Sequence, residues 1–459
     1  MPHSFRFQPR VEPVVGAAGE LPLRELATRL GPGPLALFDG WPRGASVLGF
    51  APLECALPRS LPGLRACMAR LVPAAGDPMP AAFHGGFLGA FAYELGAAAE
   101  RGLVLPSDPW RLPRLVGGLF TDFLVRDEAR GATHLVLGED PGDGRASVAE
   151  RARALHRRLA QPGGVEACVS RGSLRRLVPR AEHARRIERA RELIGAGEIY
   201  QANLTHRFER DVVGDPLELY GRLKRLHPAP YAGFLRWASG ALLSVSPELL
   251  LEFGAGAHGL RARTRPIKGT ASRGRDAAED RGRVAALLAS AKDRSELAMI
   301  VDLERNDLGR IAQPGGVEVL GFPSLESYAS VHHLAADVVA RPRPGIDALA
   351  CLTALFPGGS VTGAPKLRSM EVIAELEGEG RGFAYGSLLA LDTRGELVAN
   401  LLIRTLIWRP RPGRGAGEIT FRVGGGITWG SDPAAEEAEA EAKGVLLARA
   451  LDGGGGSSQ

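Results

Sequence analysis

Lys268 is the residue of this chain whose surroundings best suit nucleophilic chemistry. It lies in the stretch RTRPIKGT (Arg263–Thr270), between an isoleucine and Gly-Thr. Arg261, Arg263 and Arg265 precede it, and neighbouring cations lower a lysine's pKa and so favour its neutral, nucleophilic form. The chain has only five lysines among 57 basic residues, which suggests that lysine is kept where a deprotonable amine is wanted. The alternative is a surface lysine in a basic loop.

Carboxylates from two predicted helices could hold a metal ion. Glu436 and Glu439 lie three residues apart, so they share one face of the last predicted helix. Glu296, on an earlier predicted helix, is a third candidate. Mg²⁺ is usually bound by one or two protein carboxylates together with waters and substrate oxygens, and this set would suit it. The alternative is a solvated helix face on which Glu439 pairs with Lys443.

Two further residues and one turn could bind an anion. Arg404 lies in the apolar stretch NLLIRTLIW, where a charge is costly unless it faces a partner or an anion, so a carboxylate clamp and an internal ion pair are the alternatives. His333 lies in an apolar context, SVHHLAADV, where a core histidine is the commoner outcome. The turn FPGGSVTGAPK (Phe356–Lys366) lacks phosphate-loop spacing, yet its backbone N–H groups could bind a carboxylate.

The elements that position these residues form a mixed pattern. Residues 1–165 show short strand-like runs, and QPGG at Gln161–Gly164 is the first plausible boundary before a catalytic region at 175–450. Residues 451–459 read as a flexible tail. Strand pairs interspersed with helices, without regular βαβ alternation, indicate an α+β fold with antiparallel sheets.

Five local predictions can be compared with the structure. Apolar spacing predicts helices at 181–194 and 277–308, the second with Glu296 at the margin of its apolar side. Asp347 is a predicted helix N-cap, and Asp432 followed by proline is another. Residues 397–408 read as one strand.

Composition excludes several classes of protein. Hydrophobic and charged contents of 45% and 24% over 459 residues are typical of a globular chain. The net charge of +5 comes from scattered arginines, which gives no nucleic-acid footprint. No signal core or membrane-length apolar run is present. The cysteines show no CxxC spacing and indicate buried free thiols in a reducing, cytoplasmic setting; they are Cys55, Cys67, Cys168 and Cys351.

Several of these stretches together resemble the chorismate-utilising enzymes, the family that includes anthranilate synthase component I. They run in the family's order and spacing over about residues 190–445. The matching stretches are GEIYQANL, SVSPELLLEF, RPIKGT, KDRSELAMIVDLERNDLGR, SVHHL, FPGGSVTGAPK, NLLIRT and GGGIT…SDPAAEEAEAEAK. The resemblance is weaker over the N-terminal third. It implies two antiparallel β-sheets packed as a sandwich and flanked by helices, with chorismate and Mg²⁺ bound between them.

The resemblance also implies roles for individual residues. Lys268, Glu248 and His333 match catalytic positions, and Glu296 and Glu439 match the metal carboxylates, with Glu436 close by. Positions that contact the substrate are matched by Gly269, Thr270, Arg404, Gly424, Gly425, Gly426 and Lys443. Ala384 and the pair Leu389-Ala390 depart from the family's pattern near the substrate ring.

Lys268 distinguishes branches of this family. Anthranilate synthases typically read PIAGT, whereas synthases that aminate chorismate at C4 read PIKGT, as this chain does. The resemblance implies that Lys268 attacks C2 of chorismate while Glu248 protonates the departing C4 hydroxyl, after which ammonia adds at C4 for p-aminobenzoate and folate synthesis.

The resemblance has consequences for partners and alternatives. No glutaminase-type cysteine turn is present, so ammonia is expected from a separate glutamine amidotransferase subunit. Whether the N-terminal region binds tryptophan is left open. Two alternatives to an enzyme that aminates chorismate at C4 are left open: the chain could be an anthranilate synthase component I, or a catalytically silent binding or regulatory homologue.

Overall fold

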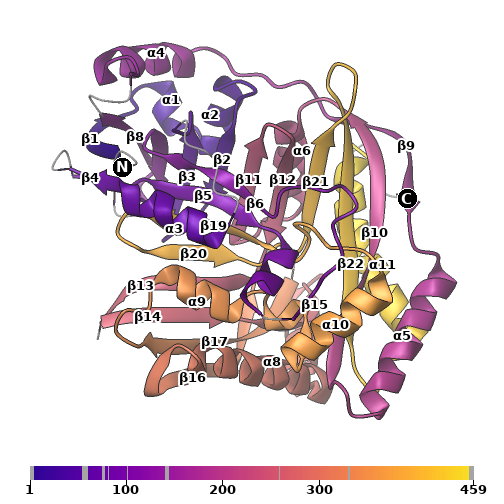
Figure 1. Ribbon diagram of the computed structural model, residues 1–459. Helices are drawn as coiled ribbons and strands as arrows, with labels where there is room; N and C mark the ends of the chain where they lie inside the picture. Colours follow the sequence, from indigo (N-terminus) through magenta and orange to yellow (C-terminus); the bar gives the residue numbers. More distant parts are fainter. Residues whose placement is uncertain are drawn as a thin grey trace.

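The computed structural model describes residues 5–53, 60–74, 78–80, 82–100, 102–139, 144–257, 259–328 and 331–453, apart from the side chains of residues 98 and 99. Of the predictions above, those for Cys55 and for the tail from 454 onwards lie outside these residues. Two β-sheets dominate the described part of the chain, and helices flank them (Figure 1). This arrangement confirms the expected α+β class.

The larger sheet has 13 strands. They are β1 (Phe5–Pro13), β2 (Leu35–Asp39), β3 (Ala45–Phe50), β4 (Leu71–Pro73), β7 (Phe123–Asp127), β8 (Ala132–Glu139), β9 (Val169–Arg176), β10 (Gln201–Val213), β11 (Tyr231–Trp237), β12 (Gly240–Ser246), β18 (Gly363–Ala364), β21 (Thr405–Pro410) and β22 (Ala416–Ile427). Their order is β18-β10-β22-β21-β12-β11-β2-β3-β7-β8-β1-β4, and β9 pairs with β10. All pairings are antiparallel except that of β1 with β4.

The smaller sheet has nine strands, all antiparallel. They are β5 (Gly86–Phe91), β6 (Leu115–Phe120), β13 (Leu249–Gly256), β14 (Gly259–Arg265), β15 (Ile267–Ser272), β16 (Ala312–Ser327), β17 (Val331–Pro342), β19 (Ser387–Asp392) and β20 (Leu397–Asn400). Their order is β15-β17-β14-β13-β20-β19-β5-β6, and β16 pairs with β17.

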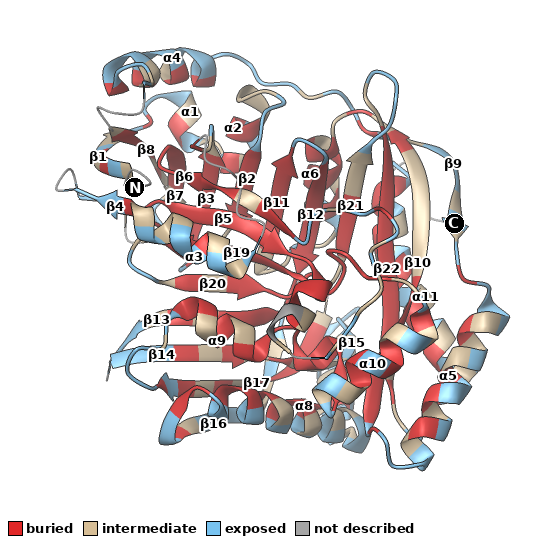
Figure 2. Cartoon of the chain, viewed as in Figure 1, coloured by how far each residue is buried: buried red, intermediate tan, exposed pale blue. Residues whose placement is uncertain are grey.

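The helices are α1 (Ala17–Glu20), α2 (Leu23–Arg29), α3 (Leu61–Arg70), α4 (Val148–Ala160), α5 (Arg180–Gly195), α6 (Pro216–Leu226), α7 (Ala277–Ala289), α8 (Ala291–Gly309), α9 (Ala348–Leu355), α10 (Lys366–Glu377) and α11 (Pro433–Leu451), with 3₁₀ helices η1 (Tyr93–Ala99) and η2 (Gly359–Val361). The strands are mostly buried, whereas many helices are exposed on the side away from the sheets (Figure 2). None of the described helices is long and apolar enough to cross a membrane.

Strands from residues 1–165 join both sheets. β2 pairs with β11, where Phe38 lies opposite Gly233, and β5 pairs with β19, where Phe91 lies opposite Ser387. The largest apolar core contains buried side chains from both sheets, including Phe38. The N-terminal region is therefore continuous, by backbone hydrogen bonds, with the strands that hold the candidate site.

Two chain segments pass from the larger sheet to the smaller one, or back, at neighbouring points. The first connects β12 to β13 through Pro247 and Glu248, and the second connects β20 to β21 through residues 401–404. The prediction of one strand over 397–408 was wrong, because these residues contribute to both sheets. The backbone N–H of Leu401 donates to the Glu248 carbonyl at 3.1 Å, and that of Val245 donates to the Arg404 carbonyl at 3.1 Å. The two crossings are thereby held side by side.

The helix predictions hold in part. Helix α5 and the side-chain caps of Asp347 and Asp432 agree with the sequence prediction. The single helix predicted over 277–308 is instead two helices, because Ser290 ends α7 and caps α8 by accepting from the Asp293 N–H. The break changes the direction of the chain before the helix that presents Glu296.

A buried ion cluster joins α10 to the larger sheet and yields a stability prediction. Glu377 is 4% exposed and accepts hydrogen bonds from Arg381 at 2.7 Å and from Arg422 at 3.3 Å. Removing one partner of a buried ion pair leaves an uncompensated charge and costs about 3–5 kcal/mol. We expect Glu377→Ala to lower the free energy of unfolding by about 3–5 kcal/mol, seen as a lower midpoint of unfolding in urea. Glu371→Ala, which removes an exposed ion pair of the same helix with Arg368, is the control; equal midpoints for the two variants would contradict the prediction.

Candidate active site

Glu248 lies at the first crossing and is buried. It is 5% exposed, and its Oε1 accepts a hydrogen bond from the Ser360 hydroxyl at 2.6 Å. Burial raises the pKa of Glu248 to about 7, although Ser360, Lys268 and Arg404 act in the opposite direction. At neutral pH this carboxyl is present in both protonation states, which is what a general acid requires.

Lys268 lies beside Glu248 on β15. Its Nζ donates to the Ser360 carbonyl at 3.3 Å, so Ser360 of η2 contacts both catalytic candidates. Burial lowers the pKa of Lys268; Glu296 and Glu248 raise it, and Lys443 lowers it further. Lys268 is partly buried, and its amine is therefore closer to its neutral form than that of a surface lysine.

The arginines before Lys268 do not explain its lowered pKa, contrary to the sequence-based argument. Side chains alternate along strand β14, and Arg263 and Arg265 point to the face on which both pair with Asp337. Arg263 also pairs with Glu252 at 2.9 Å. These guanidinium groups are neutralised by their own partners, and the lowering of the Lys268 pKa comes first from burial.

His333 on β17 faces Gly269 and Thr270 on β15. Its Nδ1 lies 2.9 Å from the Thr270 hydroxyl and 3.2 Å from the Gly269 carbonyl. Burial, followed by Arg404, lowers the pKa of His333 to about 4, so the ring is neutral at pH 7. The Nε2 atom is buried and has no partner among the described residues. Gly269 has a φ of 70°, and a Cβ there would lie 3.0 Å from Asp293.

Arg404 is a partly buried cation without a protein partner. Across the described residues its side chain has no ion pair and no hydrogen bond, while burial lowers its pKa and Glu248 partly offsets this. Its φ of 50° lies in the left-handed region, which is uncommon for a non-glycine residue and costs free energy. An unpaired guanidinium held in this conformation suits the binding of a carboxylate.

The three candidate metal carboxylates come from α8 and α11. The Lys292 ammonium lies 3.8 Å from Glu296 and 4.0 Å from Glu436, so one cation already lies between carboxylates of the two helices. Glu436 is 6% exposed and accepts from the Ser431 hydroxyl at 2.7 Å. Glu439 is exposed and pairs with Lys443 at 2.8 Å. Mg²⁺ prefers oxygen ligands, and Glu296 and Glu436 offer carboxylate oxygens at a point where a cation is already attracted. The residues present therefore fit Mg²⁺.

The glycines of β22 allow close approach on both faces. A Cβ on Gly424 would lie 2.0 Å from the Leu204 carbonyl oxygen, so that position is required for strand packing. A Cβ on Gly425 would lie 3.1 Å from Glu436 Oε2. Gly426 faces Gln201, and the Gly424 carbonyl accepts from Lys443 Nζ at 2.9 Å. Gly425 therefore lines the space beside Glu436, whereas Gly426 lies on the opposite face of the strand, against Gln201.

Sequence reasoning missed two residues of this site. Ser360 was part of a turn assigned to anion binding, yet its hydroxyl and carbonyl contact Glu248 and Lys268. Glu304 on α8 is 2% exposed, accepts from Thr264 at 2.9 Å, and its pKa is raised to about 8 by burial and by Glu248. The signal was present, because Glu304 lies seven residues after Leu297, on the same buried stripe of the helix.

Comparisons with known proteins identify the family. A family profile described as "chorismate binding enzyme" matches residues 63–449. The chain is 36% identical over 360 residues to aminodeoxychorismate synthase component 1 of Salmonella typhimurium, covering 78% of this chain and 74% of that protein. It is 34% identical over 379 residues to anthranilate synthase component 1 of Aquifex aeolicus, covering 81% and 75%. The fold matches anthranilate synthase component I of Streptococcus pneumoniae with a TM-score of 0.73 at 24% identity, covering 98% and 93%. This chain belongs to the family of chorismate binding enzymes.

Proposed function

We propose that this chain is the synthase component of an aminodeoxychorismate synthase, which converts chorismate and ammonia to 4-amino-4-deoxychorismate. The observation that carries the proposal is the pairing of a partly buried amine with a buried acid: Lys268 and Glu248 both contact Ser360. Two relatives named for this activity, among the most similar proteins found, support it. Among the described residues, the partly buried Arg404 has no ion pair or hydrogen bond, and the buried His333 Nε2 has no partner. These two groups favour an enzyme over a silent homologue, because polar groups withdrawn from water without partners are costly unless a ligand binds them.

The first step uses the two groups at Ser360. Neutral Lys268 Nζ attacks C2 of the chorismate ring, the C1–C2 double bond shifts to C1–C6, the C5–C6 double bond shifts to C4–C5, and the C4 hydroxyl departs. Protonated Glu248 gives its proton to that hydroxyl, so water leaves rather than hydroxide. The lysine nitrogen becomes a secondary amine after losing one proton. A Glu248 pKa of about 7 and a lowered Lys268 pKa supply these two protonation states together.

The second step reverses the bond shift. Ammonia attacks C4, the two double bonds return to C5–C6 and C1–C2, and the C2–N bond to Lys268 breaks as the leaving amine regains the proton that the added ammonia loses. His333, neutral and hydrogen-bonded through Nδ1, offers its Nε2 as a proton acceptor beside the ring. Arg404, Thr270 and Gly269 are assigned to the carboxylates of chorismate.

Glu296, Glu436 and Glu439 would hold Mg²⁺, which on binding neutralises a substrate carboxylate and fixes its orientation. We expect Glu296→Gln to raise the Mg²⁺ concentration needed for half-maximal turnover by at least about 10-fold. Even the loss of a residue that only hydrogen-bonds to a metal ligand lowers metal affinity by about that factor. Turnover at saturating chorismate, measured over a range of Mg²⁺ concentrations, checks this. Asp302→Asn on the same helix, where Asp302 pairs only with Arg305 at the surface, is the control. An unchanged Mg²⁺ requirement in Glu296→Gln would exclude Glu296 as a ligand.

The proposal includes the chain's partners and setting. Ammonia is supplied by a separate glutamine amidotransferase subunit, and the "component 1" in the names of the relatives supports a second component. The described cysteines are free thiols, which supports a reducing cytoplasm. The product serves p-aminobenzoate and folate synthesis.

The experiment that tests the reaction is product identification. The purified chain is incubated with chorismate, Mg²⁺ and ammonium at mildly alkaline pH. The products are separated by chromatography and identified by mass spectrometry. We expect 4-amino-4-deoxychorismate, which an added lyase converts to p-aminobenzoate. Anthranilate would instead support the second candidate, anthranilate synthase component I, which the similarity to the Aquifex protein favours. No turnover with glutaminase present would support the silent homologue.

A further inference from the structure

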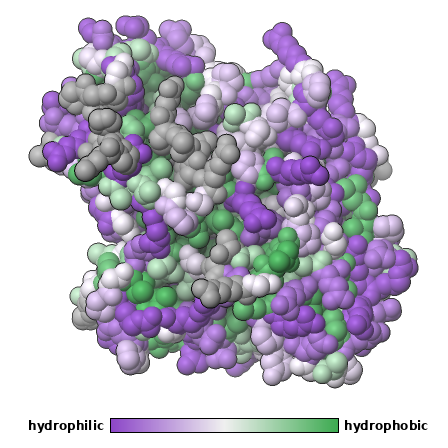
Figure 3. Space-filling model, viewed as in Figure 1, coloured by the Kyte–Doolittle hydropathy of each residue, from purple (hydrophilic) through white to green (hydrophobic). Residues whose placement is uncertain are grey.

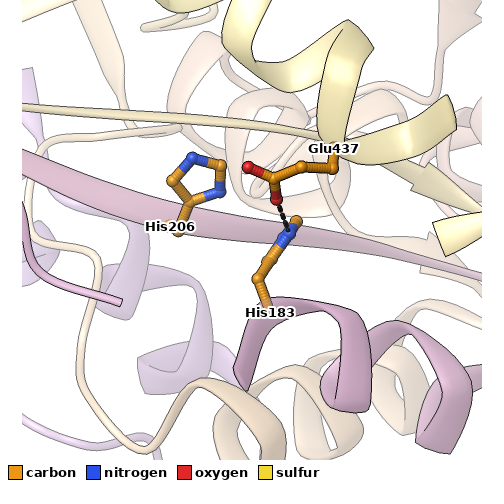
Figure 4. Close-up of side chains that lie close together, drawn as sticks. All are labelled: His183, His206 and Glu437. Carbon is orange, nitrogen blue, oxygen red and sulfur yellow. Dashed lines mark hydrogen bonds and ion pairs between the residues drawn. The ribbon is translucent and has the colours of Figure 1, made fainter. Parts of the chain in front are cut away.

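A second cluster of metal-ligating side chains lies outside the candidate active site. His183 comes from α5, His206 from β10 and Glu437 from α11, and one ligand atom from each lies within 4.8 Å of the others. His183 Nδ1 is 2.8 Å from Glu437 Oε2, and the two imidazole rings are 4.5 Å apart between centroids. Figure 4 shows the His206 ring beside the Glu437 carboxylate, with His183 reaching towards it from its helix.

The two imidazoles are buried, and three of their ring nitrogens have no hydrogen-bond partner among the described residues. His206 is 0% exposed, and neither of its nitrogens has a partner within the described residues; His183 is 1% exposed and its Nε2 is equally without one. The nearest aromatic neighbour of His206 besides His183 is Phe208, which offers no hydrogen bond to satisfy it. Leaving a buried polar group unsatisfied costs about 1–3 kcal/mol. A histidine that only filled space here would be replaced at no loss by an apolar residue, so these nitrogens point to a missing ligand.

The chemical state of the cluster suits a transition metal. Burial, the neighbouring His183 and Arg176 lower the pKa of His206 to about 3, so its ring is a neutral lone-pair donor at pH 7. Arg176 donates to both oxygens of Glu437, at 3.0 Å to Oε2, and also pairs with Glu441. Each carboxylate oxygen has two lone pairs, so Arg176 leaves Glu437 able to bind an ion, while Glu441 reduces the repulsion from the guanidinium.

We propose that His183, His206 and Glu437 form a binding site for a late first-row divalent ion, Zn²⁺ in particular, separate from the carboxylates assigned to Mg²⁺. Two imidazoles and one carboxylate are a ligand set that suits Zn²⁺, whereas Mg²⁺ prefers oxygen ligands alone. The ion would join α5, β10 and α11. Since both imidazoles are buried and Glu437 is partly buried, the ion would act structurally, by fixing the helix that also carries Glu436 and Glu439. The site does not depend on which reaction the chain performs.

Co²⁺ is the probe, because it replaces Zn²⁺ and its visible absorption reports the ligands. The chelator-treated full-length chain is titrated with Co²⁺ in excess Mg²⁺, which occupies the oxygen-ligand site. We expect one equivalent to bind tightly, to be displaced by Zn²⁺, and to lose at least about 100-fold in affinity in His206→Gln and in Glu437→Gln. His156→Gln, which alters a His–Glu pair without a second histidine, is the control and should bind Co²⁺ as the unchanged chain does.

Three outcomes would overturn the proposal: no tight Co²⁺ or Zn²⁺ binding by the unchanged chain, binding that survives in His206→Gln, or binding that is lost in Glu296→Gln instead. Circular dichroism shows whether each variant is folded. X-ray absorption at the zinc edge of the unchanged, zinc-loaded chain identifies the ligands without any substitution. We expect the spectrum to show two imidazole ligands, and an all-oxygen ligand set would mean that the ion binds elsewhere.

Discussion

Lys268→Ala is expected to abolish synthesis of 4-amino-4-deoxychorismate, with either ammonium or a glutaminase partner as the nitrogen source. Loss of an essential nucleophile lowers turnover by at least about 1000-fold. The alanine leaves the strand intact, because position 268 pairs with Leu334 through its backbone. Initial rates of product formation at saturating chorismate and Mg²⁺ measure the effect.

Lys224→Ala is the matched control for this loss. Lys224 is partly exposed, pairs with Asp39 and lies on α6, outside the candidate active site. Its variant should retain turnover. If Lys268→Ala kept more than about a tenth of the turnover of the unchanged chain, Lys268 would be a binding residue and the covalent step would be wrong.

Glu248→Gln is the second change with a large expected effect. Removing a general acid costs about 100- to 10,000-fold in rate, and the pH profile should change shape. Glu248 is protonated below its pKa of about 7, so the acid form declines as pH rises above 7. The neutral form of Lys268 increases over the same range. The unchanged chain therefore loses activity at high pH, whereas Glu248→Gln, left with the lysine ionisation alone, rises to a plateau.

The control for this profile is Glu252→Gln on β13, the strand that follows Glu248, where the carboxylate pairs with Arg263 away from Lys268. It should keep the alkaline decline. An alkaline decline of the same midpoint in Glu248→Gln would assign that ionisation to another group. The two ionisations are coupled, so the measured midpoints describe the pair of groups and not each residue separately.

The sequence indicates an interrupted strand where the first crossing between the sheets lies and no interruption at the second, and it did not predict that the chain changes sheets at either point. Ser246, Pro247 and Glu248 interrupt an apolar run, and proline is a strong break signal within a strand. Residues 397–408 contain no such signal, and their apolar residues are buried in both sheets. Which sheet a strand joins depends on contacts far away in the sequence, such as the pairing of β13 with β20. Local patterns do not contain that information.

Candidate site residues could be recognised where a residue contradicted its local pattern. Arg404 in an apolar run predicted either an anion site or an internal ion pair, and among the described residues its guanidinium has no ion pair. The charge near Lys268 was misjudged, because neighbours in sequence are not neighbours in space along an alternating strand. His206 had no signal at all, since its partners His183 and Glu437 lie in separate elements.

The face drawn in Figure 3 has hydrophilic side chains over most of its edges, and hydrophobic ones gather towards its middle. The chemistry, in contrast, is concentrated in a few buried groups around Ser360, of which Lys268 is the one assigned a covalent bond to substrate. The proposed reaction therefore depends on one nitrogen atom, Nζ of Lys268.

The most direct test of that claim is to look for the covalent adduct. The unchanged chain is mixed with chorismate and Mg²⁺ without ammonia, quenched rapidly, digested and analysed by mass spectrometry. We predict a modification equal to chorismate minus water on the peptide that contains Lys268, absent from Lys268→Ala and reduced when ammonium is added before the quench. Turnover to 4-amino-4-deoxychorismate with no adduct on that peptide at any quench time would contradict the account.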